Sequence, residues 1–241
     1  MRVVSFNIHH GTVARSGPVD PGRLGEVCAA FDADVLALEE VDVGTWRSRG
    51  ADLATAVAEA CAMDHVFGPA RRFMGGWYGN ALLVRGQISA WTVVPLPKVS
   101  VKRCRQEART AVVAEVRPDA LDAATVRVAA THLAVAQEVN GVQLDHLLGV
   151  VCDGGMPTMP TVVLGDLNRF PSTVGPAARR AGLAHVPHGP TSPADPPRLV
   201  IDHVLVSPDF EVTATEVRST PMSDHAALLV DLSRASQGRP G

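Results

Sequence analysis

Several features that are common in other proteins are scarce in this chain of 241 residues. The 4 cysteines are scattered and form no CxxC pair, which favours free thiols in a reducing compartment over a disulfide framework or a zinc knot. No apolar run approaches the ~20 residues that a membrane span needs. The opening residues, MRVVSFNIHHG, lack the long apolar stretch of a signal peptide and instead predict a core strand. We therefore expect a soluble, cytoplasmic protein.

Positive charge is also limited. Lysine occurs only at Lys98 and Lys102, and the formal net charge of the chain is -3. This balance argues against a protein that binds duplex DNA through its overall charge, although a local basic groove remains compatible with it. The hydrophobic fraction of 46% and the charged fraction of 20% are those of an ordinary globular protein.

Short apolar runs recur along the chain and predict β-strands. They lie at Val3–Asn7, Val35–Leu38, Asn80–Val84, Thr110–Val116, Val126–His132, Thr161–Leu164, Val200–Val206 and Ala226–Leu232. Helical spacing of apolar residues predicts helices at Asp20–Ala30, Asp52–Met63, Asn140–Cys152 and Thr173–Ala181. The first of these opens with Asp20-Pro21, an N-cap followed by a proline at the first helical position.

The order of these elements predicts the architecture. Strands and helices alternate early in the chain, whereas its middle and end are richer in strands, so we expect a layered α/β or α+β fold. One domain is expected over residues 1–232, followed by a flexible tail over residues 233–241. The Pro/Gly-rich stretch Pro187–Pro197 is expected to form a long surface loop.

Polar side chains gather where the predicted strands begin or end. Asn7 ends the first strand, Glu39 and Glu40 end the second, and similar residues mark later strands: His132, Asp166, Asn168, Asp202, Asp224 and His225. Burying so many carboxylates, amides and imidazoles separately would be costly without partners or an ion. Their convergence on one rim is the economical hypothesis, and it describes a metal-assisted hydrolytic site.

The ordered motifs carry a family resemblance. SFNIHHG, ALEEVD, YGNALL, ATHL, LGDLN, IDHVLVS and SDHAAL follow one another from Val3 to about Asp231. Each motif alone is weak, but together, in this order, they resemble the endonuclease/exonuclease/phosphatase (DNase I-like) family of metal-dependent phosphoesterases. The resemblance implies a four-layer α/β/β/α sandwich, with two packed mixed sheets flanked by helices and the site at one end of the sheets.

The resemblance implies a metal site. Glu40 would be the principal ligand, with Asn7 and Asp224 beside it, because a hard ion such as Mg²⁺ favours carboxylate oxygens and retains waters. Mn²⁺ is an alternative ion. Glu39 is expected to face the other way. His9 and His10 are adjacent on what is predicted to be a strand, so their side chains should point to opposite faces and not share an ion.

It also implies catalytic roles. Asp166 would orient and deprotonate the attacking water, Asn168 would stabilise charge developing at phosphorus, and His132 would contact a phosphate oxygen. A carboxylate at Asp202 would fix the tautomer of His225 and raise its pKa. His225 could then neutralise the phosphate or act as a general acid or base.

Other polar residues are placed around this centre. Asn80 and Arg109 are predicted to bind substrate, with Asn80 equally suited to a structural role. His203 follows Asp202 and should turn to the opposite face of its strand. His185 and His188 are predicted to lie in a loop without a catalytic role.

The substrate is a phosphoester of undetermined kind. The basic residues Lys98, Lys102, Arg103, Arg105 and Arg109, with Arg71 and Arg72, either attract phosphate or are solvated loop charge. The acidic balance favours a small phosphodiester or phosphomonoester as the substrate. The family resemblance implies a monomer. A DNA or RNA nuclease is the alternative within the family, and a catalytically silent module that binds a phosphorylated ligand or a protein is the alternative of another class.

Overall fold

The computed structural model describes residues 1–13, 17–99, 106–122, 124–153 and 155–235. Its strands are β1 (Arg2–Asn7), β2 (Val35–Val43), β3 (Asp64–Phe73), β4 (Gly76–Val84), β5 (Gly86–Pro95), β6 (Thr110–Pro118), β7 (Val126–His132), β8 (Thr161–Asp166), β9 (Ala184–His185), β10 (Asp202–Val206), β11 (Phe210–Arg218) and β12 (Ala227–Arg234). Its helices are α1 (Pro21–Ala29), α2 (Leu53–Cys61), α3 (Gln137–Val151) and α4 (Pro171–Arg180), with short 3₁₀ turns η1 (His9–Gly11) and η2 (Asp119–Leu121).

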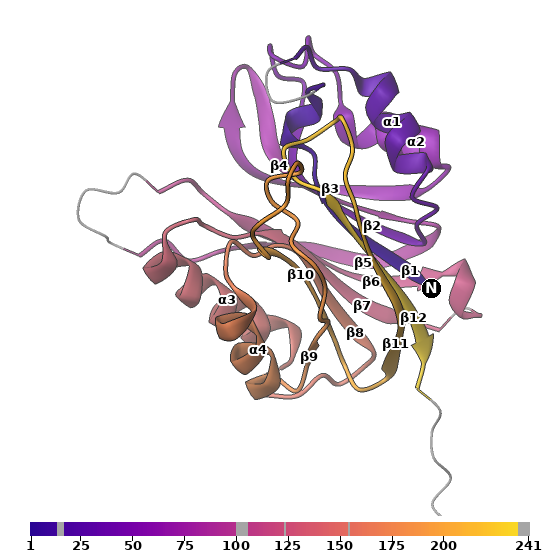
Figure 1. Ribbon diagram of the computed structural model, residues 1–241, viewed down its shortest axis with the longest axis vertical. Helices are drawn as coiled ribbons and strands as arrows, with labels where there is room; N and C mark the ends of the chain where they lie inside the picture. Colours follow the sequence, from indigo (N-terminus) through magenta and orange to yellow (C-terminus); the bar gives the residue numbers. More distant parts are fainter. Residues whose placement is uncertain (14–16, 100–105, 123, 154, 236–241) are drawn as a thin grey trace, which may run out of the picture.

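The strands form two six-stranded sheets. Their orders are β11-β12-β1-β2-β4-β3 and β5-β6-β7-β8-β10-β9. Each sheet is mixed, because β1 pairs with β2 and β7 with β8 in parallel, whereas the other strand pairs are antiparallel. Figure 1 shows α1 and α2 on one side of the molecule and α3 and α4 on the other, with the sheets between them.

Three apolar cores hold these layers together. The first lies between the sheets and contains residues of both, such as Val3 and Val128. The second joins the first sheet to α1 and α2 through Leu24 and Leu53, and the third joins the second sheet to α3 and α4 through Leu147. Three apolar interfaces stack four layers, so the expected α/β/β/α sandwich is confirmed.

Helix starts follow the capping residues. The side chain of Asp20 accepts a hydrogen bond from the backbone N–H of Arg23, with Pro21 as the first residue of α1. Asp52 caps α2 in the same way, through the N–H of Thr55. These polar starts are visible in the sequence, and both helices begin within one residue of the predicted position.

Strand boundaries differ more. The second strand was predicted over Val35–Leu38 with Glu39 and Glu40 at its end. In the structure β2 continues to Val43 through an irregularity between Leu38 and Val41, where Glu40 has a φ of 60°. This β-bulge places an extra residue in the strand without ending it. The strand expected from Val200 begins only at Asp202.

Three long strands were not predicted. In β3, β5 and β11 most residues are exposed or half-buried, so the apolar alternation that marks a strand is weak. The last strand runs on to Arg234, two residues into the segment predicted as a tail, and residues 236–241 lie outside the described ones.

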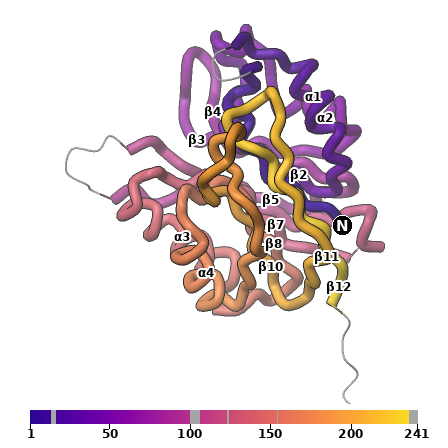
Figure 2. The backbone as a smooth tube through the Cα atoms, viewed as in Figure 1, coloured from indigo at the N-terminus to yellow at the C-terminus, as the bar shows by residue number. Residues whose placement is uncertain are grey.

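The first and last strands of the chain are neighbours. Arg2 pairs with Asp231 and Ser5 with Leu228 in an antiparallel register. Figure 2 shows the N-terminus of the chain beside β11 and β12. Motifs from the two ends of the sequence therefore meet at the same end of the sandwich. Within the described residues, no helix is both long and apolar enough to cross a membrane.

Candidate active site

Asp166 lies at the centre of the polar rim. It ends β8 and is almost fully buried. Its Oδ2 accepts a hydrogen bond from Nδ2 of Asn7 at 3.1 Å and lies 3.5 Å from Nε2 of His132 and 3.9 Å from Nε2 of His225. Its Oδ1 accepts the backbone N–H of Asn168 at 3.0 Å. Groups from the ends of β1 and β7, from the segment after β8 and from the segment before β12 therefore converge on one carboxylate.

A carboxylate–imidazole pair stands beside it. Nδ1 of His225 lies 2.9 Å from Oδ2 and 3.1 Å from Oδ1 of Asp202, the residue that opens β10. The hydroxyl of Thr191 donates a further hydrogen bond to the same carboxylate. Because Nδ1 is occupied, Nε2 of His225 faces the site, and its only hydrogen-bonding neighbour among the described residues is the hydroxyl of Ser192 at 3.4 Å.

The bulge in β2 supplies Glu40. Its Oε1 lies 3.3 Å from Nδ2 of Asn7, so one amide nitrogen contacts the carboxylates of both Glu40 and Asp166. On the other side, Oε2 of Glu40 lies 3.8 Å from Nδ1 of His10. The backbone of Glu40 is left-handed, with a φ of 60°.

Glu39 does not turn away from the site, contrary to expectation. It is fully buried between the sheets and hydrogen-bonds the hydroxyl of Ser5. Burial raises its pKa well above the usual range, and the charges of Asp202 and Asp166 add to the effect. The carboxyl group of Glu39 therefore lies beside the site, where burial favours its neutral form.

The pKa values of the central groups are spread widely. Burial raises the pKa of Asp166 to about 7, and the charge of Asp202 adds to this rise. Burial would lower the pKa of His225, but the charge and hydrogen bond of Asp202 outweigh it and raise that pKa to about 10. Burial and the charge of Arg109 lower the pKa of His132 to about 3. At neutral pH the site thus holds a charged His225, a neutral His132 and a carboxylate able to exchange a proton.

Glu40 is anionic in this setting. Burial would raise its pKa, but His10, His132 and the amide of Asn7 lower it to about 2. Asp202 is likewise held in the charged form, because His225 and Thr191 offset the effect of burial and lower its pKa.

Arg109 and Tyr78 flank the centre. Arg109 is almost fully buried, its Nη2 lies 3.6 Å from Glu107, and its Nε has no hydrogen-bond partner among the described residues. Burial and the nearby charge of Glu40 raise the pKa of Tyr78, while a hydrogen bond with Arg109 opposes the rise. The charge of Arg109 also lowers the pKa of His132, so Arg109 adds positive charge beside the polar rim.

Three other predicted site residues are held differently. The amide of Asn80 donates to the carbonyl of Thr110 at 2.9 Å and ties the two sheets together. Nδ2 of Asn168 donates to the carbonyl of Leu133 at 3.1 Å, which fixes this amide at the end of β7. Asp224 lies at the rim, with its carboxylate 3.9 Å from Nδ1 of His9.

Ser223 joins the two ends of the chain at the site. Its hydroxyl donates to the backbone carbonyl of Asn7 at 2.6 Å and accepts the backbone N–H of His225 at 3.0 Å. The first and last motifs are thereby held in register. Ser223, Thr191 and Tyr78 were not among the predicted site residues, because a hydroxyl gives no distinctive pattern in the sequence.

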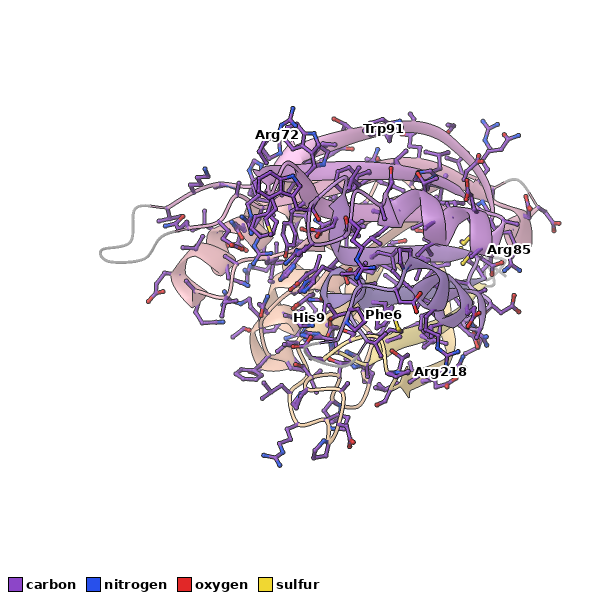
Figure 3. All side chains as sticks on the ribbon, turned by 90° about the horizontal axis from the view of Figure 1, so that it is seen from above. Phe6, His9, Arg72, Arg85, Trp91 and Arg218 are labelled. Atoms are coloured by element: carbon purple, nitrogen blue, oxygen red, sulfur yellow. The ribbon has the colours of Figure 1, made fainter. Side chains whose placement is uncertain are left out.

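The prediction for His9 and His10 rested on a strand that does not extend so far. Both residues lie in the turn η1 with positive φ, 43° and 49°, and their ring centroids are 4.3 Å apart. They therefore flank the site together, and Figure 3 shows His9 near Phe6, toward the middle of the molecule. His203, by contrast, faces away from the centre as expected, and contacts His185 and the carbonyl of Arg169.

Some of the basic residues singled out in the sequence lie near this site and others lie away from it. Arg71 forms an ion pair with Glu107 at 3.0 Å, which links the β3–β4 hairpin to the residues before Arg109. Arg72 lies over the ring of Trp77, and Figure 3 places Arg72 at the periphery. Lys102, Arg103 and Arg105 lie outside the described residues.

The donor set fits a hard divalent ion. Glu40 and Asp166 direct carboxylate oxygens to the same amide nitrogen, and such oxygens suit Mg²⁺ or Mn²⁺ better than softer metals. Asp166, Asp202 and His225 also bring ligand atoms within 4.8 Å of one another, although the last two are already paired.

The sandwich with this polar rim defines the class of DNase I-like proteins. Residues 4–225 match the model of the Endonuclease/Exonuclease/phosphatase family, and the chain belongs to that family. A comparison with curated proteins found no match.

Solved structures share the fold. The endonuclease/exonuclease/phosphatase from Beutenbergia cavernae DSM 12333 has a TM-score of 0.76 and 24% identity, over 98% of this chain and 72% of that one. The human Nocturnin catalytic domain with bound sulfate has a TM-score of 0.72 and 18% identity, over 98% and 93%. The mannosyl-6-phosphatase from Bacteroides thetaiotaomicron VPI-5482 has a TM-score of 0.69 and 17% identity, over 97% and 99%.

Proposed function

We propose that this protein is a divalent-metal-dependent phosphoesterase that hydrolyses a small phosphomonoester or phosphodiester by attack of an activated water at phosphorus. The observation that carries the proposal is the convergence on Asp166 of His132, at 3.5 Å, and of His225, at 3.9 Å, with Asp202 2.9 Å from His225. Family membership and the similarity to phosphatases support it.

Each central residue has a role that fits its protonation. Asp166, with a pKa near 7, would accept the proton of the water, since a general base works best near the operating pH. His225, charged on Nε2, would donate a hydrogen bond to a phosphate oxygen or a proton to the leaving group. His132 would contact another phosphate oxygen, and Asn168 would stabilise charge developing at phosphorus. Arg109 and Asn80 would hold the substrate side.

Glu40 would be the main ligand of Mg²⁺ or Mn²⁺, assisted by Asn7 and Asp224. Such an ion would polarise the phosphoryl oxygens and offset the negative charge that develops at phosphorus. Asn7 also bridges Glu40 and Asp166, which keeps the ligand and the base at a constant spacing.

The test is hydrolysis of p-nitrophenyl phosphate and bis-p-nitrophenyl phosphate with Mg²⁺, with Mn²⁺ and with EDTA. We expect metal-dependent turnover that Asp166→Asn and His225→Ala each lower by about 10²-fold or more. Asp145→Asn and His146→Ala, exposed changes of the same kinds on α3, serve as matched controls. Turnover that persists in EDTA, or that survives Asp166→Asn, would contradict the proposal.

A nuclease is the second candidate, and one observation favours it. Trp46 is 76% exposed, and Arg72 stacks on Trp77 at 4.0 Å in the β3–β4 hairpin. The bases of single-stranded nucleic acids stack on exposed aromatic side chains, and arginine side chains add to this binding. Plasmid DNA, RNA and DNA oligonucleotides, nucleotides and sugar phosphates tested side by side would distinguish the two candidates. Trp46 lies in the turn after β2 and donates its backbone N–H to Met74 of the hairpin. Loss of nucleic-acid cleavage, but not of p-nitrophenyl phosphate hydrolysis, in Trp46→Ala would assign the surface around Trp46 to nucleic-acid binding.

A further inference from the structure

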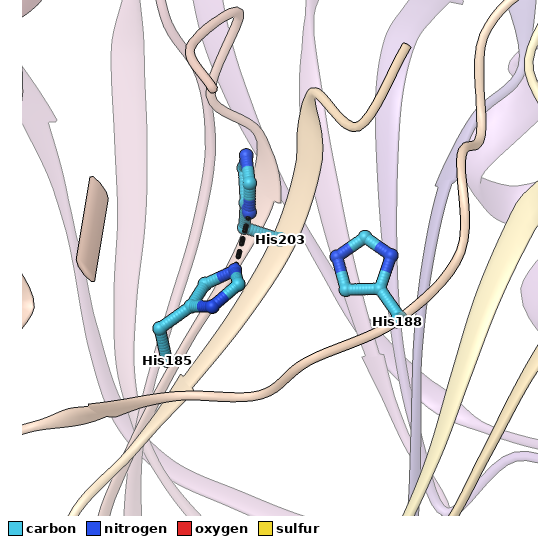
Figure 4. A group of neighbouring side chains, drawn as sticks. All are labelled: His185, His188 and His203. Carbon is cyan, nitrogen blue, oxygen red and sulfur yellow. Dashed lines mark hydrogen bonds between the residues drawn. The ribbon is translucent and has the colours of Figure 1, made fainter. Parts of the chain in front are cut away.

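Three histidines meet on the far side of β10 from the catalytic groups. His185 lies in β9, His188 in the segment that follows it, and His203 in β10 next to Asp202. Their ring centroids are 4.9–5.9 Å apart, and each offers a ring nitrogen within 4.8 Å of the other two. Figure 4 shows His185 and His203 joined by a hydrogen bond, with the ring of His188 across from them.

Backbone carbonyls set the tautomers of two of these rings. Nε2 of His203 lies 2.7 Å from the carbonyl of Arg169, and Nδ1 of His188 lies 2.7 Å from the carbonyl of Gly189. Because a carbonyl only accepts hydrogen bonds, these nitrogens carry the protons. The lone pairs of the two rings are therefore on Nδ1 of His203 and Nε2 of His188.

These two lone pairs are not both satisfied by the protein. Nε2 of His185 lies 2.8 Å from Nδ1 of His203 and can donate to it. Nε2 of His188 is buried and has no hydrogen-bond partner among the described residues. A buried nitrogen lone pair without a donor costs free energy, and an ion held by all three rings would remove that cost.

The rings are also in the form that binds metals. Burial lowers the pKa of all three, to about 4 for His185 and about 3 for His203, so they are neutral at physiological pH. A ligating histidine usually donates its second N–H to a carbonyl or carboxylate, and His203 and His188 already do so.

We propose that His185, His188 and His203 form a binding site for one Zn²⁺ or similar transition ion, separate from the Mg²⁺ or Mn²⁺ of the proposed active site. Three imidazole nitrogens suit Zn²⁺, whose fourth position would take a water, whereas Mg²⁺ prefers oxygen. On binding, His185 carries its proton on Nδ1 and turns Nε2 toward the ion. Ligands at about 2.0–2.1 Å from a tetrahedral ion lie roughly 3.3 Å apart, so the contact between His185 and His203 lengthens only slightly.

The ion would fasten a segment that supports the catalytic groups. The chain from His188 to β10 contains Thr191, which donates to Asp202, and Ser192, which lies beside His225. Tying the start of this segment to β9 and β10 limits how far its hydroxyls can move from the catalytic pair. Zinc binding itself does not depend on what the active site hydrolyses.

The test is calorimetric titration of EDTA-treated, dialysed full-length protein with Zn²⁺, in a large excess of Mg²⁺. We expect one Zn²⁺ per chain and a higher melting temperature. His188→Gln and His185→Gln should each weaken binding at least as much as the 10–100-fold that outer-shell changes cost in zinc sites. Absence of Zn²⁺ binding in the wild type would overturn the proposal.

Two matched variants assign the site. His65→Gln changes a half-buried histidine bonded to Thr55, and Asp166→Asn removes a carboxylate from the other candidate group; both should keep full Zn²⁺ affinity. Binding that is lost in Asp166→Asn and kept in His188→Gln would place the ion in the active site and refute the proposal. Binding of Co²⁺ in place of Zn²⁺ gives a test that needs no variant. We expect the intense visible absorption of tetrahedral Co²⁺ with nitrogen ligands, and the weak spectrum of octahedral Co²⁺ would contradict the site.

Discussion

The pairing of His225 with Asp202 makes a quantitative prediction about the protonation of the site. The two side chains are buried and 2.9 Å apart, and Asp202 raises the pKa of His225 to about 10 against the opposing effect of burial. A rise from the 6.5 of an ordinary histidine corresponds to roughly 5 kcal/mol in favour of the imidazolium, at about 1.4 kcal/mol per pH unit.

Asp202→Asn removes the charge but keeps the shape of the side chain and one oxygen acceptor. Burial is then opposed only by the smaller effects of Asp166 and Asp224, and we expect the pKa of His225 to fall from about 10 to below the assay pH. At pH 7.5 the ring would be neutral, so kcat should drop by about 10²–10⁴-fold.

The same variant predicts a change in stability with a definite sign. A histidine whose pKa is raised by folding stabilises the protein fully below pH 6.5, and this contribution is lost as the pH rises through about 10. The wild type should therefore exceed Asp202→Asn in free energy of unfolding most at pH 6 and by much less at pH 10.5.

The assay is an NMR titration of ¹³C-labelled histidine in metal-free, EDTA-treated protein, with urea unfolding at the two pH values. Asp209→Asn, which changes a carboxylate that accepts a hydrogen bond from Ser207, is the control and should leave the pKa of His225 unchanged. A wild-type His225 that titrates near 6.5, or a pKa that stays near 10 in Asp202→Asn, would refute the reasoning.

Three other changes have predicted outcomes. Gly165→Ala should destabilise the fold by about 3 kcal/mol or more in urea unfolding, because the φ of Gly165 is 146° and the new Cβ meets the backbone of Thr131. Gly149→Ala, its control on α3 where the space around the new Cβ is open, should instead stabilise the fold by up to about 1 kcal/mol. Ser223→Ala should cost about 1–3 kcal/mol, since it leaves a buried carbonyl and N–H unpaired, and should lower kcat more than it changes KM. Asp231→Asn should lower the free energy of unfolding by no more than about 1 kcal/mol at pH 7, because the ion pair of Asp231 with Arg2 is a third exposed. Since folding lowers the pKa of Asp231, this difference between the wild type and the variant should vanish as the pH falls well below 3.8. A difference that stays constant with pH would contradict the pairing.

Much of the fold was predictable because its core strands are strongly apolar. Val126–His132 was predicted with the correct ends, and the Asp caps fixed the starts of α1 and α2. The outer strands β3, β5 and β11 were missed, since edge strands with mostly exposed side chains do not need the apolar alternation that a core strand shows.

The sequence indicated which residues meet at the candidate site better than it indicated how they are arranged. Asp166, His132, Asp202 and His225 meet as the ordered motifs indicated. The bulge at Glu40 could not be read from the sequence, because a non-glycine residue with a positive φ leaves no compositional mark. The histidine cluster was not predicted for another reason: His203 comes from a different segment than His185 and His188, and only the pairing of β9 with β10 brings the three together.

The neighbouring positions of β1 and β12 have a consequence for how the protein is made. A nascent chain that has emerged only as far as β11 has neither His225 nor the antiparallel partner of β1, and Asn7 has no Ser223 to hold its carbonyl. Contacts between residues 216 positions apart form late and slowly. The entropy cost of closing such a long loop must be met before the contact stabilises the fold. Hydrolytic activity should therefore arise only after synthesis has passed residue 225, so that incomplete chains released from the ribosome carry no working site.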